Sequence, residues 1–539
     1  MAVGRRAGWV LLFGLGACLT PEARLQWRIR QLKPGFQPTG LSAPAARSGC
    51  RVTSYNDQVC CEQVQEDLKG PETLDGLRAM LHDEDAGKHR RVKVVGALHS
   101  GNRIVCTDGI AITTENLTDV MRLERRDGVQ TVVVDAGVQV GDLGQWLYEQ
   151  GWSLGFTVLG FRGVTVGGAV GTATHGSSLR HPSIFPSRLE GLWVLGPDGT
   201  DALQPGQPPV EHKRSSTPDE IFRALAGNLG VLGAVARVRL RVERRFDLQV
   251  EATYDDEKVL LRDGPRPLIA NCDYGQIVWF PRAGSIMTMC GQKTTQPSRG
   301  SAQSVLLDPR ATPLEIQLFK ELMEDTIENG APSCTIETER YWRYKSHPPL
   351  ETVCNCCTQE TSKAVGPGYR MMSSDLTGLR AEVPEIDFEL AIPMAKAKDA
   401  LTWVNQFADD QRLCLPLIGL FLRFSPKDGS SLLGHGSAHD DPDGVMFVEF
   451  VVFVREKHKP DPNDASYYGR YWQLARELVD RFDGRLHWGK NAQDLFEYQK
   501  DHSPAFKLRL DAFRKVADQL DPSGRFANDF SKRVGLTTH

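Results

Sequence analysis

Hydrophobic and polar positions alternate along much of this chain, which predicts mixed α and β structure. Residues 235–242 alternate strictly, and Val238, Leu240 and Val242 share one face. The arginines between them are expected to form a solvated face of the strand and not a binding patch. Further strands are predicted by β-branched and apolar runs at 91–95, 131–134, 276–280, 385–392, 417–424 and 445–454.

Helical spacing appears between these strands and again near the carboxyl end. Val140, Leu143 and Leu147 share one face of a helix that Gly151 ends. Two amphipathic helices are predicted over 471–482 and 506–520. We therefore expect an α+β protein. Its predicted parts are a signal peptide at 1–25, a linker at 26–49, folded domains at 50–245 and 246–470, and a C-terminal helical segment at 471–539.

The amino terminus has the pattern of a secretory signal peptide. Arg5 and Arg6 precede an apolar run at 7–19 that is short for a bilayer span, which needs about 20 residues. An uncleaved anchor and a lipobox ending at Cys18 are the alternatives. We expect a protein of the secretory pathway, extracellular or lumenal, with no stable membrane span once the signal is removed.

Cysteine usage fits an oxidising compartment, because the chain has 12 cysteines. Cys50, Cys60 and Cys61 are expected to pin the start of the folded part through disulfides whose pairing stays open. Residues 354–357 contain a C-x-x-C without a second pair, so a disulfide or buried thiols are expected there and no metal site. Asn116 begins a glycosylation sequon, which matters only if the chain is secreted.

Charge and composition exclude some classes of partner. The chain has 64 basic and 68 acidic residues and a net charge of −4, so it has no electrostatic footprint for nucleic acid. The chain has 51 glycines, and this high content indicates places where the backbone could lie close to a ligand.

Two segments carry candidate cofactor chemistry. Residues 94–101 (VVGALHSG) run from a strand into a turn of small residues whose N–H groups can face a phosphate. Residues 163–178 (GVTVGGAVGTATHGSS) combine glycines with hydroxyls but have neither Rossmann nor P-loop spacing. Taken alone, the first segment is a weak signal, and the second could be a glycine-rich surface loop.

Together the two segments resemble the cofactor domain of the FAD-linked oxidases of the vanillyl-alcohol oxidase superfamily. The sequences CTDG at 106–109, GNLGVLG at 227–233 and LHWGKN at 486–491 are similar to the sugar-lactone oxidase branch, its plant-type members in particular. The resemblance covers roughly 50–535. It implies a two-part FAD-binding domain (PCMH-type) at 50–245, a substrate domain on an antiparallel sheet with flanking helices at 246–470, and an HWGK loop that returns to the flavin from the C-terminal segment.

The resemblance also implies a set of cofactor residues. His99 matches the histidine that bonds covalently to the flavin 8α-methyl in many relatives; noncovalent FAD beside a loop histidine is the alternative. Ala173 stands where many relatives have glycine, which weakens the case for oxygen as the acceptor. The expected FAD-binding residues are Gly96, His99, Ser100, Gly167, Gly168, Gly171, Thr172, Thr174, His175, Gly176 and Val235.

Three residues are expected to act on the substrate. Arg423 is a lone charge on an apolar strand, which is costly unless something pairs with it. In several relatives this strand reads Glu-x-Arg, but the first position here is Phe421. His487, as the base, and Lys490 are expected to contact substrate hydroxyls and the N1 side of the flavin; an aromatic cap with a solvated lysine is the alternative. Glu449 is a spare carboxylate.

The function that the resemblance implies is FAD-dependent oxidation of the C2 hydroxyl of an aldono-1,4-lactone. The expected substrate is L-gulono-1,4-lactone, with oxygen reduced to hydrogen peroxide and a product that tautomerises to ascorbate. An oxidase or dehydrogenase of another alditol, sugar or sugar acid is the first alternative. A flavin-free secreted binding protein is an alternative from another class. The expected partners are a sugar lactone and oxygen, without nucleic acid.

Overall fold

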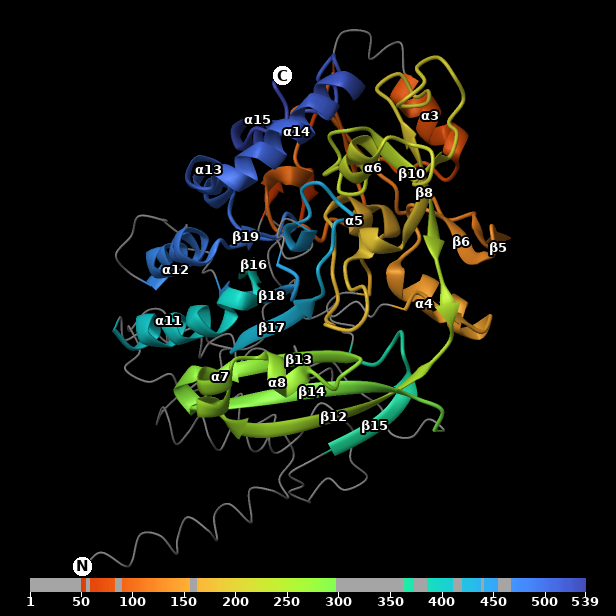
Figure 1. Cartoon of the computed structure of the whole chain (residues 1–539). Coiled ribbons are helices and arrows are strands. Elements are labelled where there is room, and N and C mark those ends of the chain that lie inside the picture. The colour runs from red at the N-terminus through yellow and green to blue at the C-terminus, as the bar shows by residue number, and fades with distance from the viewer. Residues whose placement is uncertain are drawn as a thin grey trace, which may run out of the picture.

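The computed structural model describes residues 50–54, 59–82, 90–155, 162–296, 362–372, 385–410, 419–437, 441–453 and 467–539. The expected signal peptide and linker and the cysteines at 354–357 lie outside these residues. Figure 1 shows the described chain as two domains, with the last helices folded back beside the first domain.

The first domain has two parts. One is a parallel pair, β3 with β4, packed with helix α3, and the other is an antiparallel sheet in the order β5-β6-β10-β8-β9. The strands are β3 (Val92–Val95), β4 (Ile110–Thr113), β5 (Met121–Arg126), β6 (Val129–Asp135), β8 (Leu189–Leu195), β9 (His212–Lys213) and β10 (Ala234–Arg241). The helices are α3 (Leu74–His82), α4 (Val140–Glu149), α5 (Val166–Gly171) and α6 (Asp219–Leu225), with a 3-10 turn η1 (Arg103–Val105).

The prediction of a solvated arginine face on β10 is wrong. Arg239 is 5% exposed, and it donates to Glu211 at 2.6 Å and to Glu124 at 2.7 Å. Arg237 is half-buried and donates to Asp135 at 2.6 Å. Of the three arginines, only Arg241 at the end of the strand is exposed. The physical reason is that β10 is the middle strand of its sheet. Acidic side chains from neighbouring segments cover its polar face and pair with the guanidinium groups.

The second domain is built on an eight-stranded sheet in the order β15-β12-β14-β13-β17-β18-β16-β19. All its strand pairs are antiparallel. The strands are β12 (Asp247–Asp256), β13 (Tyr274–Phe280), β14 (Ser285–Thr294), β15 (Ser362–Pro367), β16 (Glu385–Pro393), β17 (Leu420–Ser425), β18 (Val445–Phe453) and β19 (Arg485–Leu486). Helices α7 (Glu257–Asp263), α8 (Arg266–Ile269) and α11 (Ala397–Asp410) accompany this sheet (Figure 1). This confirms the expected fold.

The C-terminal segment connects the two domains. Its helices are α12 (Tyr467–Phe482), α13 (Gln493–His502), α14 (Pro504–Leu520) and α15 (Asp529–Val534). Tyr471, Leu474 and Leu478 of α12 are fully buried, as their helical spacing predicts. α12 packs on β16, whereas α14 contacts α6 and α15 contacts η1. One hydrophobic core therefore runs through both domains.

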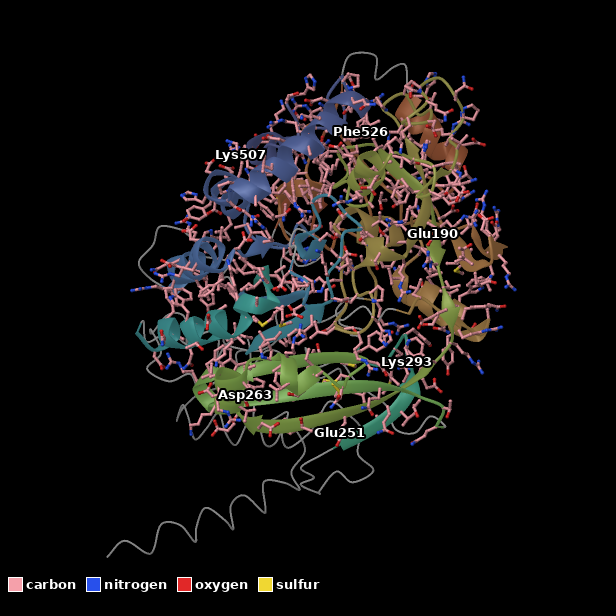
Figure 2. All side chains as sticks on the ribbon, viewed as in Figure 1. Glu190, Glu251, Asp263, Lys293, Lys507 and Phe526 are labelled. Carbon is pink, nitrogen blue, oxygen red and sulfur yellow. A yellow bond between two sulfur atoms is a disulfide. The ribbon has the colours of Figure 1, made fainter. Side chains whose placement is uncertain are left out.

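Disulfides and an ion pair reinforce the first domain and its junction with the second. Cys50 pairs with Cys60 and Cys61 with Cys106, so the start of the folded part is pinned as expected. Within the second domain, the disulfide Cys272–Cys290 joins the segment just before β13 to β14. Lys293, labelled in Figure 2, donates to Glu243 at 2.7 Å where the two domains meet. Among the described helices, none has the length and apolarity that a bilayer crossing requires.

Candidate functional site

A cavity lies between the two domains and is lined by both glycine-containing segments. Its first-domain walls come from the turn after β3, from α5 and from the loop before β10. The backbone packs tightly here: a Cβ on Gly96 would lie 2.0 Å from Thr165 Oγ1, and one on Gly167 would lie 2.9 Å from the Ala136 side chain. Glycine is needed at both positions because another segment of the chain occupies the space of a side chain.

Strained backbone marks three turns that line or adjoin this cavity. Leu98, Ala173 and Leu229 have φ values of 54°, 53° and 54°, in the left-handed region that non-glycine residues rarely adopt. Leu98 comes directly before His99, and both line the cavity. Such strain costs about 1–3 kcal/mol a residue and persists only where the surroundings impose it.

The turn that carries His99 is docked onto the HWGK loop. The amide of Gly101 donates to the carbonyl of Gly489 at 2.8 Å. Asn102 Nδ2 donates to the carbonyls of Trp488 and Lys490, each at 2.8 Å. These contacts hold together two motifs that lie nearly 400 residues apart in the sequence. These contacts explain why the two motifs occur together in one chain.

The substrate end of the cavity is built on adjacent strands of the large sheet. Glu389 of β16 pairs in register with Glu449 of β18, which in turn pairs with Phe421 of β17. Arg423 lies two residues beyond Phe421 and therefore on the same face of the sheet. β19 extends the sheet beside β16, so that the amide of His487 donates to the carbonyl of Glu389 at 3.0 Å.

Glu389 is at the centre of a buried ion-pair network. Its Oε1 lies 2.5 Å from His175 Nε2, and its Oε2 accepts from Lys490 Nζ at 2.8 Å and from Arg423 Nη1 at 3.3 Å. Glu449 Oε2 lies 2.7 Å from Arg423 Nη2, and Glu449 Oε1 accepts from Lys490. Lys490 is therefore engaged by two carboxylates, which excludes the alternative of a solvated lysine.

Electrostatics fix the charge states in this network. Burial alone would raise the pKa of Glu389, but the charge of Lys490 and the hydrogen bond from His175 hold that pKa well below its ordinary value. Burial likewise opposes ionisation of Glu449, while Arg423 and Lys490 lower its pKa. Burial would lower the pKa of Lys490, but Glu389 and Glu449 raise it. The network therefore holds two carboxylates, an ammonium and a guanidinium.

Two histidines beside the network are neutral. Burial lowers the pKa of His435 to about 4, and burial together with the neighbouring His435 lowers the pKa of His487 well below its ordinary value. His435 has both ring nitrogens buried, and its Nε2 lies 3.5 Å from Glu389 Oε1. His487 Nδ1 accepts a hydrogen bond from the amide of Gly489 at 2.9 Å.

His175, Glu389, His435 and His487 also have the ligand types of a metal site, with ligand atoms within 4.8 Å of one another. Ligands around tetrahedral zinc lie about 3.4 Å apart, given Zn–N distances of about 2.0–2.1 Å. Both oxygens of Glu389 already accept hydrogen bonds from cations or imidazole. We therefore interpret this cluster as a hydrogen-bonded network.

The structure brings most of the predicted site residues into the lining of one cavity. Gly176 is the exception: it does not line the cavity, because its carbonyl faces His175 Nδ1 at 2.9 Å and its amide bonds to Ser183. The predicted residues that line the cavity are Gly96, His99, Ser100, Gly167, Gly168, Gly171, Thr172, Thr174, His175, Val235, Arg423, His487 and Lys490.

Sequence reasoning missed several residues of this site. Lys93 lies at the end of the cavity near Val235, and its Nζ donates to the Leu229 carbonyl at 2.8 Å. Asp387 lines the opposite end, and Glu389 lies behind that wall. The signal that identified Arg423, a lone charge in an otherwise apolar strand, does not single out Glu389, because β16 also carries Glu385 and Asp387.

The residues present fit the FAD that the sequence predicts. The walls are backbone and small side chains along the first domain, which suits an extended dinucleotide lying against main-chain N–H groups. The far end carries the two cations Arg423 and Lys490, where charge on a reduced flavin can be stabilised. His99 lines the same cavity.

Comparison with known proteins agrees with this assignment. Residues 238–534 match the family model of D-arabinono-1,4-lactone oxidase, and residues 71–201 match that of an FAD binding domain. The chain is 22% identical to the L-gulonolactone oxidase of Bos taurus, over 93% of this chain and 99% of that protein. It is 24% identical to the L-gulono-1,4-lactone dehydrogenase of Mycobacterium tuberculosis, over 83% and 91% of the two chains.

A plant protein and a solved structure complete the comparison. The L-gulonolactone oxidase 3 of Arabidopsis thaliana is 23% identical, over 91% of this chain and 85% of that protein. The crystal structure of cholesterol oxidase from B. sterolicum has a TM-score of 0.67 and 12% identity, covering 92% of this chain and 100% of that chain. At that identity the structural likeness establishes the fold alone.

Proposed function

The chain belongs to the D-arabinono-1,4-lactone oxidase family of FAD-dependent oxidoreductases, and we propose that it oxidises the C2 hydroxyl of L-gulono-1,4-lactone. Oxygen is the electron acceptor in this proposal and hydrogen peroxide the second product. The 2-keto-lactone then tautomerises to ascorbate. FAD, when bound, supplies the acceptor for the hydride that leaves C2.

The observation that carries the proposal is the network of Arg423, Lys490 and Glu449 at one end of the cofactor cavity. Guanidinium and ammonium groups donate hydrogen bonds, and carboxylate oxygens accept them. A polyhydroxylated lactone presents alternating hydroxyl donors and acceptors that match such a wall. A long apolar alcohol has a single hydroxyl and would use few of these hydrogen-bonding groups.

The electron acceptor depends on a residue of the flavin-side turn. Ala173 is 1% exposed with φ 53°, and a Cβ added to Gly434 would lie 3.0 Å from its side chain. The side chain thus occupies space that glycine would leave open. A lactone dehydrogenase, in which a protein or dye accepts the electrons, is the second candidate function that this observation favours.

A substrate and acceptor panel tests the proposal. Purified protein is incubated with L-gulono-, L-galactono- and D-arabinono-1,4-lactone and with alditols, while peroxide release and cytochrome c reduction are followed in parallel. Peroxide formation highest with L-gulono-1,4-lactone supports the proposal. Cytochrome c reduction without peroxide makes the protein a dehydrogenase. Turnover of alditols but of no lactone contradicts the proposed substrate.

We also propose that the protein acts in the secretory pathway. The support is chemical: the described residues contain three disulfides, a number typical of proteins that fold in an oxidising compartment. Asn116 of the sequon is exposed on the first domain. A fusion of residues 1–49 to a reporter, followed for secretion and for cleavage, tests this proposal. Retention of the uncleaved fusion in the cytosol would contradict it.

A further inference from the structure

The cavity contains few side chains that can accept a proton from a substrate hydroxyl. Lys490 is an ammonium and Arg423 a guanidinium, and both groups only donate hydrogen bonds. Among the ionisable side chains that line this end of the cavity in the described part of the chain, the remaining ones are His175, His487, Asp387 and Glu449. Both ring nitrogens of His175 are already engaged, Nδ1 with the Gly176 carbonyl at 2.9 Å and Nε2 with Glu389 at 2.5 Å.

His487 presents a donor and not an acceptor to the cavity. Its Nδ1 accepts the amide hydrogen of Gly489 at 2.9 Å, so that nitrogen carries no proton. The ring is neutral because burial lowers its pKa. A neutral imidazole holds one proton, which must then be on Nε2. The ring therefore offers an N–H group to a ligand, and this geometry does not favour the base role expected from the sequence.

Glu449 is a carboxylate of the cavity lining that lies beside both cations. It lines the cavity, and it lies between the two cations that can hold the substrate oxygen, with Arg423 Nη2 2.7 Å from its Oε2 and Lys490 bonded to its Oε1. Its register partner on the neighbouring strand is Phe421. A carboxylate at 449 thus faces the same side of the sheet as Arg423, one strand away from the apolar residue at 421.

We propose that Glu449 is the residue that accepts the C2 hydroxyl proton in the reaction proposed above. The C2–H bond breaks with its electron pair, which leaves as hydride to FAD, the oxidant. The O–H bond breaks as its electrons form the C2=O double bond, and the proton passes to a carboxylate oxygen of Glu449. His487 Nε2–H, Arg423 and Lys490 hold the substrate oxygens.

The two cations beside Glu449 make it a weak base, and the chemistry tolerates this. As hydride leaves C2, the oxygen becomes that of a protonated carbonyl, which is far more acidic than a carboxylic acid. An ionised carboxylate within hydrogen-bond reach is then a sufficient acceptor. Asp387 is the competing carboxylate. Its charge also raises the pKa of Lys490, after Glu389 and Glu449 in size of effect, so a variant of Asp387 is included in the test.

The test compares Glu449→Gln, His487→Gln and Asp387→Asn in the FAD-loaded protein. Anaerobic rapid mixing with L-gulono-1,4-lactone measures flavin reduction, and the flavin spectrum before mixing reports an intact site. Glu449→Gln is expected to slow reduction by about 10²–10⁴-fold, the usual range for loss of a positioned proton acceptor. His487→Gln, which keeps an N–H donor, is expected to slow reduction by about 10-fold or less.

Several outcomes would overturn the proposal. Reduction of Glu449→Gln within about 10-fold of the parent removes Glu449 from the role. A large loss in His487→Gln or Asp387→Asn with a small loss in Glu449→Gln transfers the role to that residue. Should Glu449→Gln fail to bind FAD, Glu449→Asp replaces it: this variant keeps the charge but is one methylene shorter. It is expected to reduce FAD at least 10-fold more slowly, and parent-like reduction contradicts the proposal.

This inference rests on the proposed function, and the two fail differently. If the parent protein reduces its flavin with none of the lactones, the proposed function is wrong. If the parent is reduced rapidly and Glu449→Gln equally so, the lactone reaction stands and the role of Glu449 is wrong.

Discussion

Glu389→Gln is the substitution with the largest expected effect on stability. The side chain of Glu389 is fully buried, and it is bonded to His175 at 2.5 Å, Lys490 at 2.8 Å and Arg423 at 3.3 Å. Glutamine has nearly the same shape, so packing is retained and only the charge is lost. Arg423 and Lys490 would then share the single carboxylate of Glu449.

The magnitude follows from the burial of the remaining charges. Removal of one partner of a buried ion pair typically costs about 3–5 kcal/mol, because the other charge is left uncompensated away from water. Glu190→Gln is the matched control. Glu190, labelled in Figure 2, pairs with Arg241, whose side chain is 53% exposed. A surface pair of this kind contributes about 0–1 kcal/mol.

The assay is chemical denaturation of the FAD-loaded proteins, followed by tryptophan fluorescence at pH 7 and again at pH 4. The pKa of Glu389 in the fold is below its ordinary value, so its stabilisation is complete above about pH 4.3 and is lost as the pH falls toward the folded pKa. The difference between parent and Glu389→Gln should therefore be smaller at pH 4 than at pH 7 by about 0.6 kcal/mol, since pH 4 lies only slightly below the ordinary pKa of a glutamate. A loss no larger than that of Glu190→Gln at pH 7 would refute the reasoning.

The other predictions concern the flavin loops and a buried amine. His99→Ala should leave FAD extractable by acid precipitation, whereas the parent should keep yellow colour in the pellet; free FAD from the parent contradicts the covalent link. Ala173→Gly should accelerate reoxidation of substrate-reduced enzyme by oxygen in rapid mixing, and no change means that Ala173 is not a gate. Burial lowers the pKa of Lys93 to about 7, so the folded protein binds fewer protons than the unfolded one between about pH 7 and pH 10. The parent should then gain about 1.4 kcal/mol of unfolding free energy per pH unit relative to Lys93→Met in urea titrations, and a pH-independent difference would show that Lys93 stays charged.

Local patterns were enough to predict most elements of the fold. The helix marked by Val140, Leu143 and Leu147 is present as Val140–Glu149, with all three residues buried. The strand expected at 417–424 is present as Leu420–Ser425. Such elements are predictable because apolar periodicity depends only on which face meets a core. The ends shift by a few residues because local hydrogen bonding, and not periodicity, determines them.

The arginines of β10 show where periodicity is not sufficient. Alternation with Val238 and Leu240 identifies two faces, but it does not reveal that Glu124 and Glu211 cover the polar one. Those carboxylates come from segments far away in the sequence. Their approach depends on the strand order β5-β6-β10-β8-β9, which one sequence does not supply.

The geometry of the site also depends on strand order, but the charged residues in the sequence give some information about the site. Arg423 and Glu449 are each the single charge of an apolar strand, whereas Glu389 shares its strand with Glu385 and Asp387; each of the three would be costly to bury alone. With Lys490 the four formal charges cancel, which is the condition for burying them as one network. A search for lone charges on apolar strands would therefore have found Glu449 beside Arg423, whereas Glu389 is identified as the partner of Arg423 and Lys490 only in the fold. What such a search cannot supply is the register that places Glu449 between Glu389 and Phe421, since that follows from the packing order of β16, β18 and β17.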